Sequence, residues 1–317
     1  MNIVYLDGYT LNPGDLDWRP LARLGNFKVY DNSSLEEGIE RGKLADIILV
    51  NKFPVTRDVL KHWPDLKCVC VTATGYNNLD IPILQKRNII ACNAVGYSTP
   101  STAQHTIALI LALANKIGMY NADVQSDGWS NSNTWTYYLS PTIELQGLTL
   151  GIIGLGDIGK RVAKIASSLG LKIIATSRRV QSGTIAGIEM VKPTEIFRQS
   201  DFISLHLPLN KDSHHIINRV TLDLMKSSVF LINTSRGGLI HEDDLKSALV
   251  NQKIAGAALD VLSDEPPSAN HPLIGLNNCI ITPHMAWATV SSRQRLLDIC
   301  IKNVEAFIKG KPRNTIA

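Results

Sequence analysis

The segment LTLGIIGLGDIGKRVAKIASSLG, residues 148–170, decides the fold of this chain. It consists of an apolar strand, a glycine-rich turn of the form G-x-G-x-x-G, and a helix. Gly154 permits a tight turn, Gly156 lets the backbone approach a pyrophosphate, and Gly159 lets the helix pack closely on the strand. The start of the helix then offers free N–H groups to phosphates. The segment predicts a dinucleotide-binding βαβ unit.

The next expected strand ends in ATSRR, residues 175–179, where dinucleotide-binding folds commonly place an acid. An acid there would hydrogen-bond the adenosine ribose 2′-hydroxyl and repel a 2′-phosphate. Ser177 does not repel a phosphate, and Arg178 or Arg179 could pair with it. The stretch therefore predicts a preference for NADP(H) over NAD(H). The alternative is that both arginines are solvated surface charges and either cofactor is used.

Short apolar runs alternate with helical stretches along the whole chain. This pattern indicates parallel strands that are buried on both faces. Before the glycine turn we expect strands at Ile3–Leu6, Phe27–Tyr30, Ile47–Val50, Cys68–Thr72 and Ile89–Cys92. From the turn onward we expect strands at Thr149–Ile153, Lys172–Ala175, Phe202–Leu207, Val229–Ile232, Gly256–Leu259 and Cys279–Ile281. The predicted fold class is α/β, with two doubly wound parallel-sheet domains.

Two long helices and one aromatic segment complete the expected organisation. Thr99 can cap a helix that runs to Gly118, and Ser291–Lys309 forms an amphipathic helix at the end of the chain. Residues 121–146 lack clear periodicity and contain exposed aromatic candidates, so we expect an extension that contacts another subunit.

The composition limits the class of protein. The 317 residues, 44% hydrophobic and 19% charged, can bury the cores of two domains. The net charge of +4 is diffuse, which does not argue for a nucleic-acid partner. The longest apolar run, Thr106–Ala114, is too short for a membrane span, and no signal peptide is evident, so a cytoplasmic location is expected. The five cysteines include no C-x-x-C motif and indicate reduced core residues, with no metal site.

Polar side chains that suit acid–base chemistry follow three expected strands of the second sheet. They lie in INTSRGGLIHEDDL (232–245), AGAALDVLSDEPP (255–267) and IITPHMAWAT (280–289). Ligands of open parallel sheets bind beyond the carboxyl ends of the strands, so these side chains should share one crevice. Arg236 can grip a carboxylate with two hydrogen bonds, and His284 can exchange a proton with a carbonyl oxygen. Glu265 would favour the imidazolium and orient its ring.

These motifs, together with LDGYTLNPGDL (6–16) and VTATGYNNLD (71–80), resemble the D-2-hydroxyacid dehydrogenase family over nearly the whole chain. Within that family the resemblance is to the glycerate dehydrogenase or hydroxypyruvate reductase branch. It implies reduction of a small 2-keto acid, hydroxypyruvate or glyoxylate, to the D-hydroxy acid. It also implies a catalytic Arg236, Glu265 and His284.

The resemblance further implies ligand contacts and domains. The backbone of Ala73, Thr74 and Gly75 would bind the substrate carboxylate, and Asp260 would hold the nicotinamide carboxamide. Further cofactor contacts would come from Thr102, Asp157, Ile158, His206, Leu207, Pro208 and Thr234. A flavodoxin-like substrate domain (1–100 and 286–317) and a Rossmann dinucleotide-binding domain (101–285) would enclose a cleft. Residues 121–146 would be the arm of a homodimer.

Two other functions remain open at this stage. The chain could be a dinucleotide-sensing regulatory protein of the same fold, or a dehydrogenase of the formate or phosphite type. The roles of three aromatic residues also stay open. Trp287 could line the substrate pocket or lie in a core. Tyr137 and Tyr138 could pack within the arm or reach the site of a partner subunit.

The remaining histidines are expected to have ordinary roles. We expect His105 to pack in its helix and His241 to begin a helix. His214 and His215 look like a metal pair, but adjacent histidines in a strand would point to opposite faces, and we expect them to be polar residues of a loop.

Overall fold

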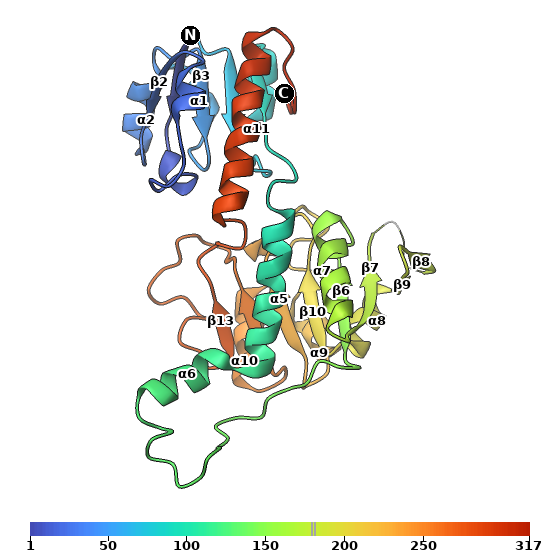
Figure 1. The fold of residues 1–317 in the computed structure, drawn as a ribbon. Helices are drawn as coiled ribbons and strands as arrows, with labels where there is room; N and C mark the ends of the chain where they lie inside the picture. Colours follow the sequence, from blue (N-terminus) through green and yellow to red (C-terminus); the bar gives the residue numbers. More distant parts are fainter. Residues whose placement is uncertain (179, 181) are drawn as a thin grey trace. The chain divides into compact units, whose positions relative to one another are not determined.

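The computed structural model describes residues 1–317 except 179 and 181 (Figure 1). The chain divides into two compact units. Unit 1 comprises Met1–Ser98 and Trp287–Ala317, and unit 2 comprises Thr99–Ala286. Each unit is built around a predominantly parallel sheet with helices, which confirms the predicted α/β fold class.

Unit 1 contains a five-stranded sheet in the order β2-β1-β3-β4-β5, and every neighbouring pair is parallel. The two innermost apolar runs, IILV and CVCV, are buried at every residue, as strands covered on both faces must be. The order reverses direction between β1 and β3, as in flavodoxin-like sheets. The strands are β1 (Asn2–Tyr5), β2 (Asn26–Val29), β3 (Ile47–Val50), β4 (Cys68–Val71) and β5 (Ile90–Cys92).

The last helix of the chain, α11 (Val290–Ile308), belongs to unit 1 and lies beside its sheet (Figure 1). Its apolar face buries Leu296, Cys300 and Val304 in the same core as the strands. Thr289 caps its start by accepting a hydrogen bond from the Ser292 N–H. The shorter helices of this unit are η1 (Gly8–Thr10), α1 (Arg19–Ala22), α2 (Leu35–Gly42), α3 (Arg57–Leu60) and α4 (Ile81–Lys86).

Unit 2 contains an eight-stranded sheet in the order β13-β12-β11-β10-β6-β7-β9-β8. All neighbours are parallel except the β8–β9 pair. The strands are β6 (Thr149–Ile153), β7 (Lys172–Thr176), β8 (Thr184–Ile185), β9 (Ile188–Met190), β10 (Phe202–Leu205), β11 (Phe230–Asn233), β12 (Gly256–Leu259) and β13 (Cys279–Ile281). The predicted strands are all present, whereas the short β8 and β9 carry too few residues to show a period and were not predicted.

Helices cover both faces of this sheet (Figure 1). The helix α5 packs against α7 and shares its apolar core with β6 and β10. The helices are α5 (Thr99–Asn115), α6 (Ile117–Gln125), α7 (Asp157–Ser168), α8 (Pro193–Gln199), α9 (Arg219–Asp223), η2 (Gly237–Leu239) and α10 (Glu242–Val250).

The predicted end of the long helix at Gly118 is wrong. The helix α5 stops at Asn115, because Lys116 adopts the left-handed conformation with φ of 52°, and α6 then starts a new direction. The segment 121–146, which shows no clear periodicity in the sequence, is helical at its start, where α6 continues to Gln125. In the described chain no single helix is long and apolar enough to span a membrane. The helices α5 and α6 reach the required length and apolar composition only when taken together, and the chain bends by 60° between them.

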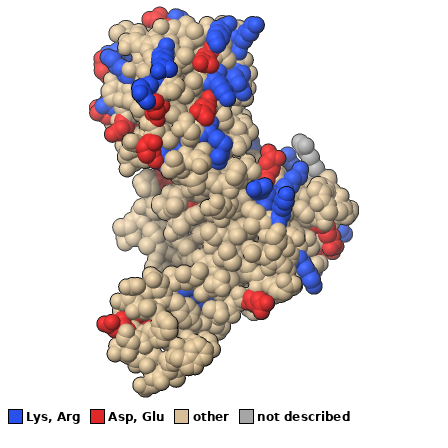
Figure 2. Space-filling model, viewed as in Figure 1, with Lys and Arg blue, Asp and Glu red and all other residues tan. Residues whose placement is uncertain are grey.

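The segment that follows α6 exposes its aromatic side chains. Trp129, Trp135 and Tyr138 are 53%, 86% and 84% exposed. Tyr137 instead donates a hydrogen bond from its hydroxyl to Asp123 Oδ2 at 2.6 Å, and this bond raises the pKa of Tyr137 to about 12. Figure 2 shows few charged side chains over this part of the surface.

The cysteines are free, and all except Cys279 are buried. The burial of four cysteines agrees with the expected core positions. Among the described residues, no group of His, Cys, Asp and Glu side chains could hold a metal ion.

Candidate active site

The glycine turn after β6 has the geometry that a dinucleotide phosphate needs. Gly154 has φ of +100°, and a Cβ there would lie 2.3 Å from the His206 carbonyl oxygen. A Cβ at Gly159 would lie 2.3 Å from the Gly154 oxygen. At Gly156 a Cβ would meet no protein atom within 4 Å, and no side chain caps α7, whose first residues are Asp157 and Ile158. Packing therefore excludes side chains at Gly154 and Gly159, whereas Gly156 borders open space at the start of α7, where a pyrophosphate is expected.

At the end of β7, Ser177 closes a turn. Its hydroxyl donates to the Val180 oxygen at 3.2 Å and accepts from the Val180 N–H at 3.1 Å. Arg178 is 73% exposed and forms an ion pair with Asp212, Nη1 to Oδ2 at 2.6 Å. Arg179, the other predicted phosphate partner, lies outside the described residues.

Arg236 follows β11 and begins the short helix η2. Asn233 supports this turn, because its side chain donates to the Arg236 oxygen at 2.9 Å and accepts from the Ser235 N–H at 3.0 Å. Gly237 is required next, since a Cβ there would lie 1.9 Å from the carbonyl carbon of Leu262. One guanidinium nitrogen of Arg236 donates to the Ser235 oxygen at 2.7 Å. The turn thus fixes the start of a side chain that has further donors for a carboxylate.

Glu265 and His284 are in direct contact. Glu265 Oε2 lies 2.6 Å from His284 Nδ1, and its other oxygen accepts from the Leu262 N–H at 3.1 Å. His284 adopts the left-handed conformation with φ of 51°, and its N–H donates to the Asp260 oxygen at 2.8 Å. Both side chains are about a third exposed, at 32% and 28%. A carboxylate accepts hydrogen bonds, so this contact favours the tautomer of His284 that carries its proton on Nδ1.

Asp260 is only 1% exposed and holds the backbone that carries His284. Its carboxylate accepts hydrogen bonds from Thr282 Oγ1 at 2.6 Å, from the Met285 N–H at 2.9 Å and from the Ala286 N–H at 2.8 Å. These contacts assign Asp260 a positioning role. Its expected bond to a nicotinamide carboxamide stays a prediction.

His105 joins the same network, which corrects the expectation of simple packing. Its Nε2 lies 3.1 Å from Thr282 Oγ1 and 3.5 Å from Asp260 Oδ1. His105 lies on α5, and both partners lie far along the chain from it, so no local pattern could predict these contacts.

The turn after β10 contains three expected cofactor contacts, His206, Leu207 and Pro208. His206 Nε2 lies 2.8 Å from Ser204 Oγ. Its Nδ1 is buried without a hydrogen-bond partner in the described part of the chain, although the residue as a whole is partly exposed. Burial lowers the pKa of His206 to about 4. The ring is therefore neutral at pH 7.

Thr234 and Thr102 are linked through Thr106. Thr106 Oγ1 lies 3.0 Å from Thr234 Oγ1 and donates to the Thr102 oxygen at 2.8 Å. The start of α5 is thereby tied to the loop that carries Arg236. This arrangement supports the prediction that Thr102 and Thr234 belong to the same cofactor site.

In unit 1, the loop of Ala73, Thr74 and Gly75 follows β4 and is held from one side. Thr74 Oγ1 donates to the Ala94 oxygen at 2.8 Å, and Asn93 donates to the Thr74 oxygen at 2.8 Å. The Ala94 N–H donates a hydrogen bond to the Ala73 oxygen at 3.0 Å. The carbonyl groups of the loop are thus engaged.

The expectation that His214 and His215 belong to a polar loop agrees with the structure, although their rings do not point apart. They lie in a turn, where His215 has φ of 51°, and their ring centroids are 3.7 Å apart. His241 does begin α10 as expected, and its side chain accepts a hydrogen bond from the Asp244 N–H. Trp287 packs edge-on against Tyr97 with centroids 6.0 Å apart, in the core of unit 1.

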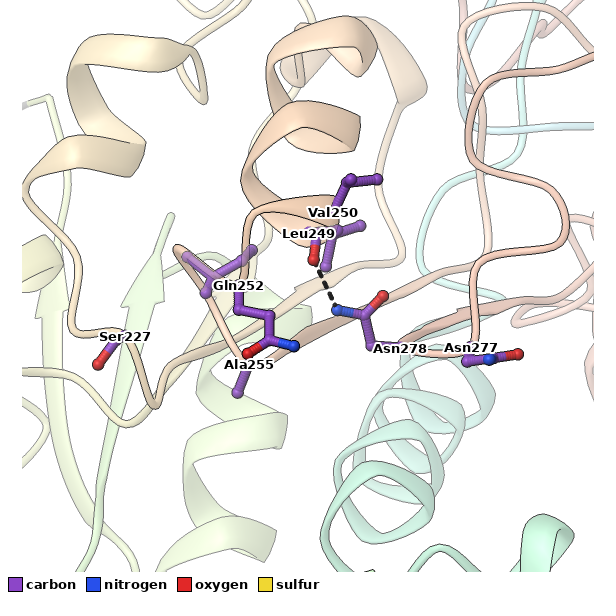
Figure 3. A pocket seen from close by; sticks show the side chains of 8 residues that line it. Ser227, Leu249, Val250, Gln252, Ala255, Asn277 and Asn278 are labelled. Atoms are coloured by element: carbon purple, nitrogen blue, oxygen red, sulfur yellow. Dashed lines mark hydrogen bonds between the residues drawn. The ribbon is translucent and has the colours of Figure 1, made fainter.

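A surface hollow lies at the opposite edge of the unit 2 sheet (Figure 3). Its lining residues Ser227, Ala255 and Asn278 precede β11, β12 and β13, at the amino ends of these strands. Asn278 donates to the Leu249 oxygen there at 3.1 Å. Because Arg236, Glu265 and His284 follow the carboxyl ends, this hollow is not the candidate active site.

The chain is similar in sequence to known proteins over nearly its whole length. The family model described as D-isomer specific 2-hydroxyacid dehydrogenase, NAD binding domain, matches residues 107–286. A hydroxypyruvate reductase of Blautia hydrogenotrophica is 43% identical, covering 100% of this chain and 99% of the relative. A glycerate dehydrogenase of Methylorubrum extorquens is 38% identical, covering 99% and 98%.

Solved structures show the same fold at full length. The structure of the acyclic imino acid reductase Bsp5 in complex with NADPH and D-Arg matches with a TM-score of 0.85 and 33% identity, and covers 100% of both chains. The chain therefore belongs to the D-isomer specific 2-hydroxyacid dehydrogenase family, within its glycerate dehydrogenase and hydroxypyruvate reductase branch, as an oxidoreductase with a nicotinamide-dinucleotide-binding domain.

Proposed function

We propose that this protein reduces hydroxypyruvate or glyoxylate to the corresponding hydroxy acid, D-glycerate or glycolate, and that it favours NADPH over NADH. The observation that carries this proposal is the 2.6 Å contact between Glu265 Oε2 and His284 Nδ1, at the carboxyl ends of the unit 2 strands. A carboxylate-oriented imidazole in this place suits proton transfer to a carbonyl oxygen. The branch to which the relatives belong supports the choice of substrate.

Arg236 binds the substrate carboxylate in this proposal. Its guanidinium can form two parallel hydrogen bonds with the two carboxylate oxygens and polarise the adjacent keto group. The backbone N–H groups of Ala73, Thr74 and Gly75 contribute further bonds to that carboxylate. A bound nicotinamide supplies the hydride for reduction and accepts it in the reverse reaction.

His284 supplies the proton. With Nδ1 held by Glu265, the Nε2–H donates to the keto oxygen as the alcohol forms, and the neutral ring accepts the proton back in oxidation. Asp260 keeps His284 in place through the loop Thr282–Ala286, and desolvation of this network strengthens its bonds.

The preference for NADPH rests on the residues after β7. Ser177 carries no charge to repel a 2′-phosphate, and Arg178 presents an exposed guanidinium beside it. NAD(H) remains an accepted cofactor, because Asp212 neutralises part of that positive charge.

The first experiment replaces His284 with Ala. Turnover of hydroxypyruvate should fall by about 10²- to 10⁴-fold, because the proton donor is lost, while the affinity for NADPH should stay within about twofold. His62→Ala removes an exposed histidine of unit 1 and should leave both quantities unchanged. Near-normal turnover in His284→Ala would contradict the acid–base role.

The same assay separates the other functions. Turnover of roughly 1 per second or more with a keto acid excludes a purely dinucleotide-sensing role. Oxidation of formate or phosphite with no activity on keto acids would replace the proposed substrate class.

A further inference from the structure

The acid that is missing from the end of β7 is supplied from another loop. Asp212, in the turn after β10, places Oδ2 2.6 Å from Nη1 of Arg178. The two side chains are 69% and 73% exposed, so the pair lies at the surface and is reached by solvent and ligands. A carboxylate therefore stands beside the guanidinium that suits a 2′-phosphate, although no acid follows the strand itself.

The position of Asp212 is set by its own loop. Asn210 Oδ1 accepts from the Asp212 N–H at 2.9 Å and from the Ser213 N–H at 3.2 Å. Ser213 Oγ in turn donates to the Pro208 oxygen at 2.7 Å. The loop is thus tied back to the turn at His206–Pro208, which is an expected part of the cofactor site. The carboxylate is presented by a closed turn rather than by a free loop tip.

We propose that Asp212 is a cofactor-selectivity residue that competes with the 2′-phosphate of NADP(H) for Arg178. The inference rests on the proposed use of a nicotinamide cofactor by this site. A 2′-phosphate carries a charge of about −1.5 to −2, so it is repelled by Asp212 and must displace it from the guanidinium. The 2′-hydroxyl of NAD(H) carries no charge, and a carboxylate can accept its hydrogen bond. Asp212 thereby narrows the preference for NADP(H) that Ser177 and Arg178 create.

The test measures equilibrium binding of 2′,5′-ADP and of 5′-AMP by titration calorimetry, with the full chain and without substrate. These two nucleotides differ by the 2′-phosphate alone. Asp212→Asn should bind 2′,5′-ADP about tenfold more tightly at low ionic strength, and 5′-AMP within about twofold of the wild type. The gain for 2′,5′-ADP should shrink as salt is added, because both side chains are exposed.

Two further variants isolate the interaction. Asp223→Asn removes the same charge from another exposed ion pair of unit 2, with Lys253 at 3.4 Å, and should change neither affinity by more than about twofold. In an Arg178→Gln background, Asp212→Asn should lose most of its effect, because the group for which the carboxylate competes is absent.

Unchanged or weaker binding of 2′,5′-ADP by Asp212→Asn would overturn the inference, since Asp212 would then be irrelevant to Arg178 or would hold it ready for the phosphate. An equal gain for 5′-AMP would also overturn it. The proposed reaction fails separately: tight binding of both nucleotides with the expected Asp212 effect, but no turnover of keto acids, would leave the inference standing and contradict the proposed function.

Discussion

At the scale of single residues, one contact decides which nitrogen of His284 can exchange a proton. Glu265 Oε2 lies 2.6 Å from Nδ1, and Asp260 holds the backbone on both sides of the ring. Asp260 and Glu265 follow one expected strand and His284 follows the next, so their grouping could be predicted from the carboxyl-end rule. The left-handed conformation of His284 and the role of Asp260 as a backbone anchor could not be predicted, because they depend on bonds across the loop.

Arg236→Lys tests the grip on the substrate. A lysine keeps the charge but cannot form two parallel hydrogen bonds with a carboxylate, so kcat/KM for hydroxypyruvate should fall by about 100-fold through both a higher KM and a lower kcat. Initial rates at saturating NADPH measure this change. Arg219→Lys, an exposed arginine of α9, serves as the control. A loss of less than about threefold would show that Arg236 does not contact the carboxylate.

His206 predicts a pH dependence of stability. Burial lowers its pKa from 6.5 to about 4, so the unfolded chain binds the proton more readily. Its contribution to stability is therefore present above pH 6.5 and is lost as the pH falls toward about 4, by about 1–3 kcal/mol in the free energy of unfolding.

Denaturation curves across that pH range, compared with those of His206→Gln, isolate this contribution. The variant should lose less stability on acidification than the wild type. His62→Gln, which changes an exposed histidine, should behave like the wild type. Parallel pH dependences of the wild type and His206→Gln would contradict the neutral, buried ring.

At the scale of elements, the apolar runs with the clearest strand pattern in the sequence form strands in the structure. The predicted inner strands are present because their apolar runs are buried on both faces. The failures fall where local signals are weak: β8 and β9 have two and three residues, and α5 ends at Asn115, before the left-handed Lys116, rather than at Gly118.

The glycine turn permits a matched pair of substitutions. Gly154→Ala places a Cβ 2.3 Å from the His206 oxygen at a positive φ, so it should lower the melting temperature by several degrees. Gly156→Ala meets no protein atom within 4 Å, so it should fold normally but bind NADPH at least about tenfold more weakly. Thermal melting without cofactor and equilibrium NADPH binding separate the two effects. Normal NADPH binding by Gly156→Ala would place the pyrophosphate elsewhere.

At the scale of the whole molecule, unit 1 is closed by a helix from the far end of the chain. The helix α11 buries Asn303, which is 1% exposed, and its side chain donates to the Asn93 oxygen at 2.9 Å. The side-chain amide of Asn314 donates a hydrogen bond to Asn303 Oδ1 at 2.8 Å. Removing one partner of a buried hydrogen bond leaves the other partner unsatisfied, which lowers the free energy of unfolding.

Asn303→Ala should therefore lower the free energy of unfolding of unit 1 by about 1–3 kcal/mol. Tryptophan fluorescence during denaturation can follow this unit, because Trp18, Trp63 and Trp287 lie in it. Trp129 and Trp135 in unit 2 are already largely exposed. Gln294→Ala, an exposed residue of the same helix, should change stability by less than about 0.5 kcal/mol. Equal effects of the two substitutions would contradict the anchoring role of Asn303.

The aromatic segment after α6 remains our proposed arm of a homodimer. Trp135 and Tyr138 are 86% and 84% exposed in this chain, and a partner surface would bury them. Replacing both with Ser should weaken self-association by at least about tenfold in sedimentation velocity experiments, with the melting of unit 1 unchanged. A wild type that is monomeric at all concentrations would contradict the proposal.

The sequence by itself predicted the α/β class, the dinucleotide-binding turn, the inner strands and the contact between Glu265 and His284. These features depend on local periodicity, on glycine geometry and on the rule that ligands bind at the carboxyl ends of strands. Only the tertiary structure decided that His105 and Thr282 meet Asp260, and that Asp212 faces Arg178. Those contacts join residues from loops distant in the chain, and the packing of the whole sheet brings them together.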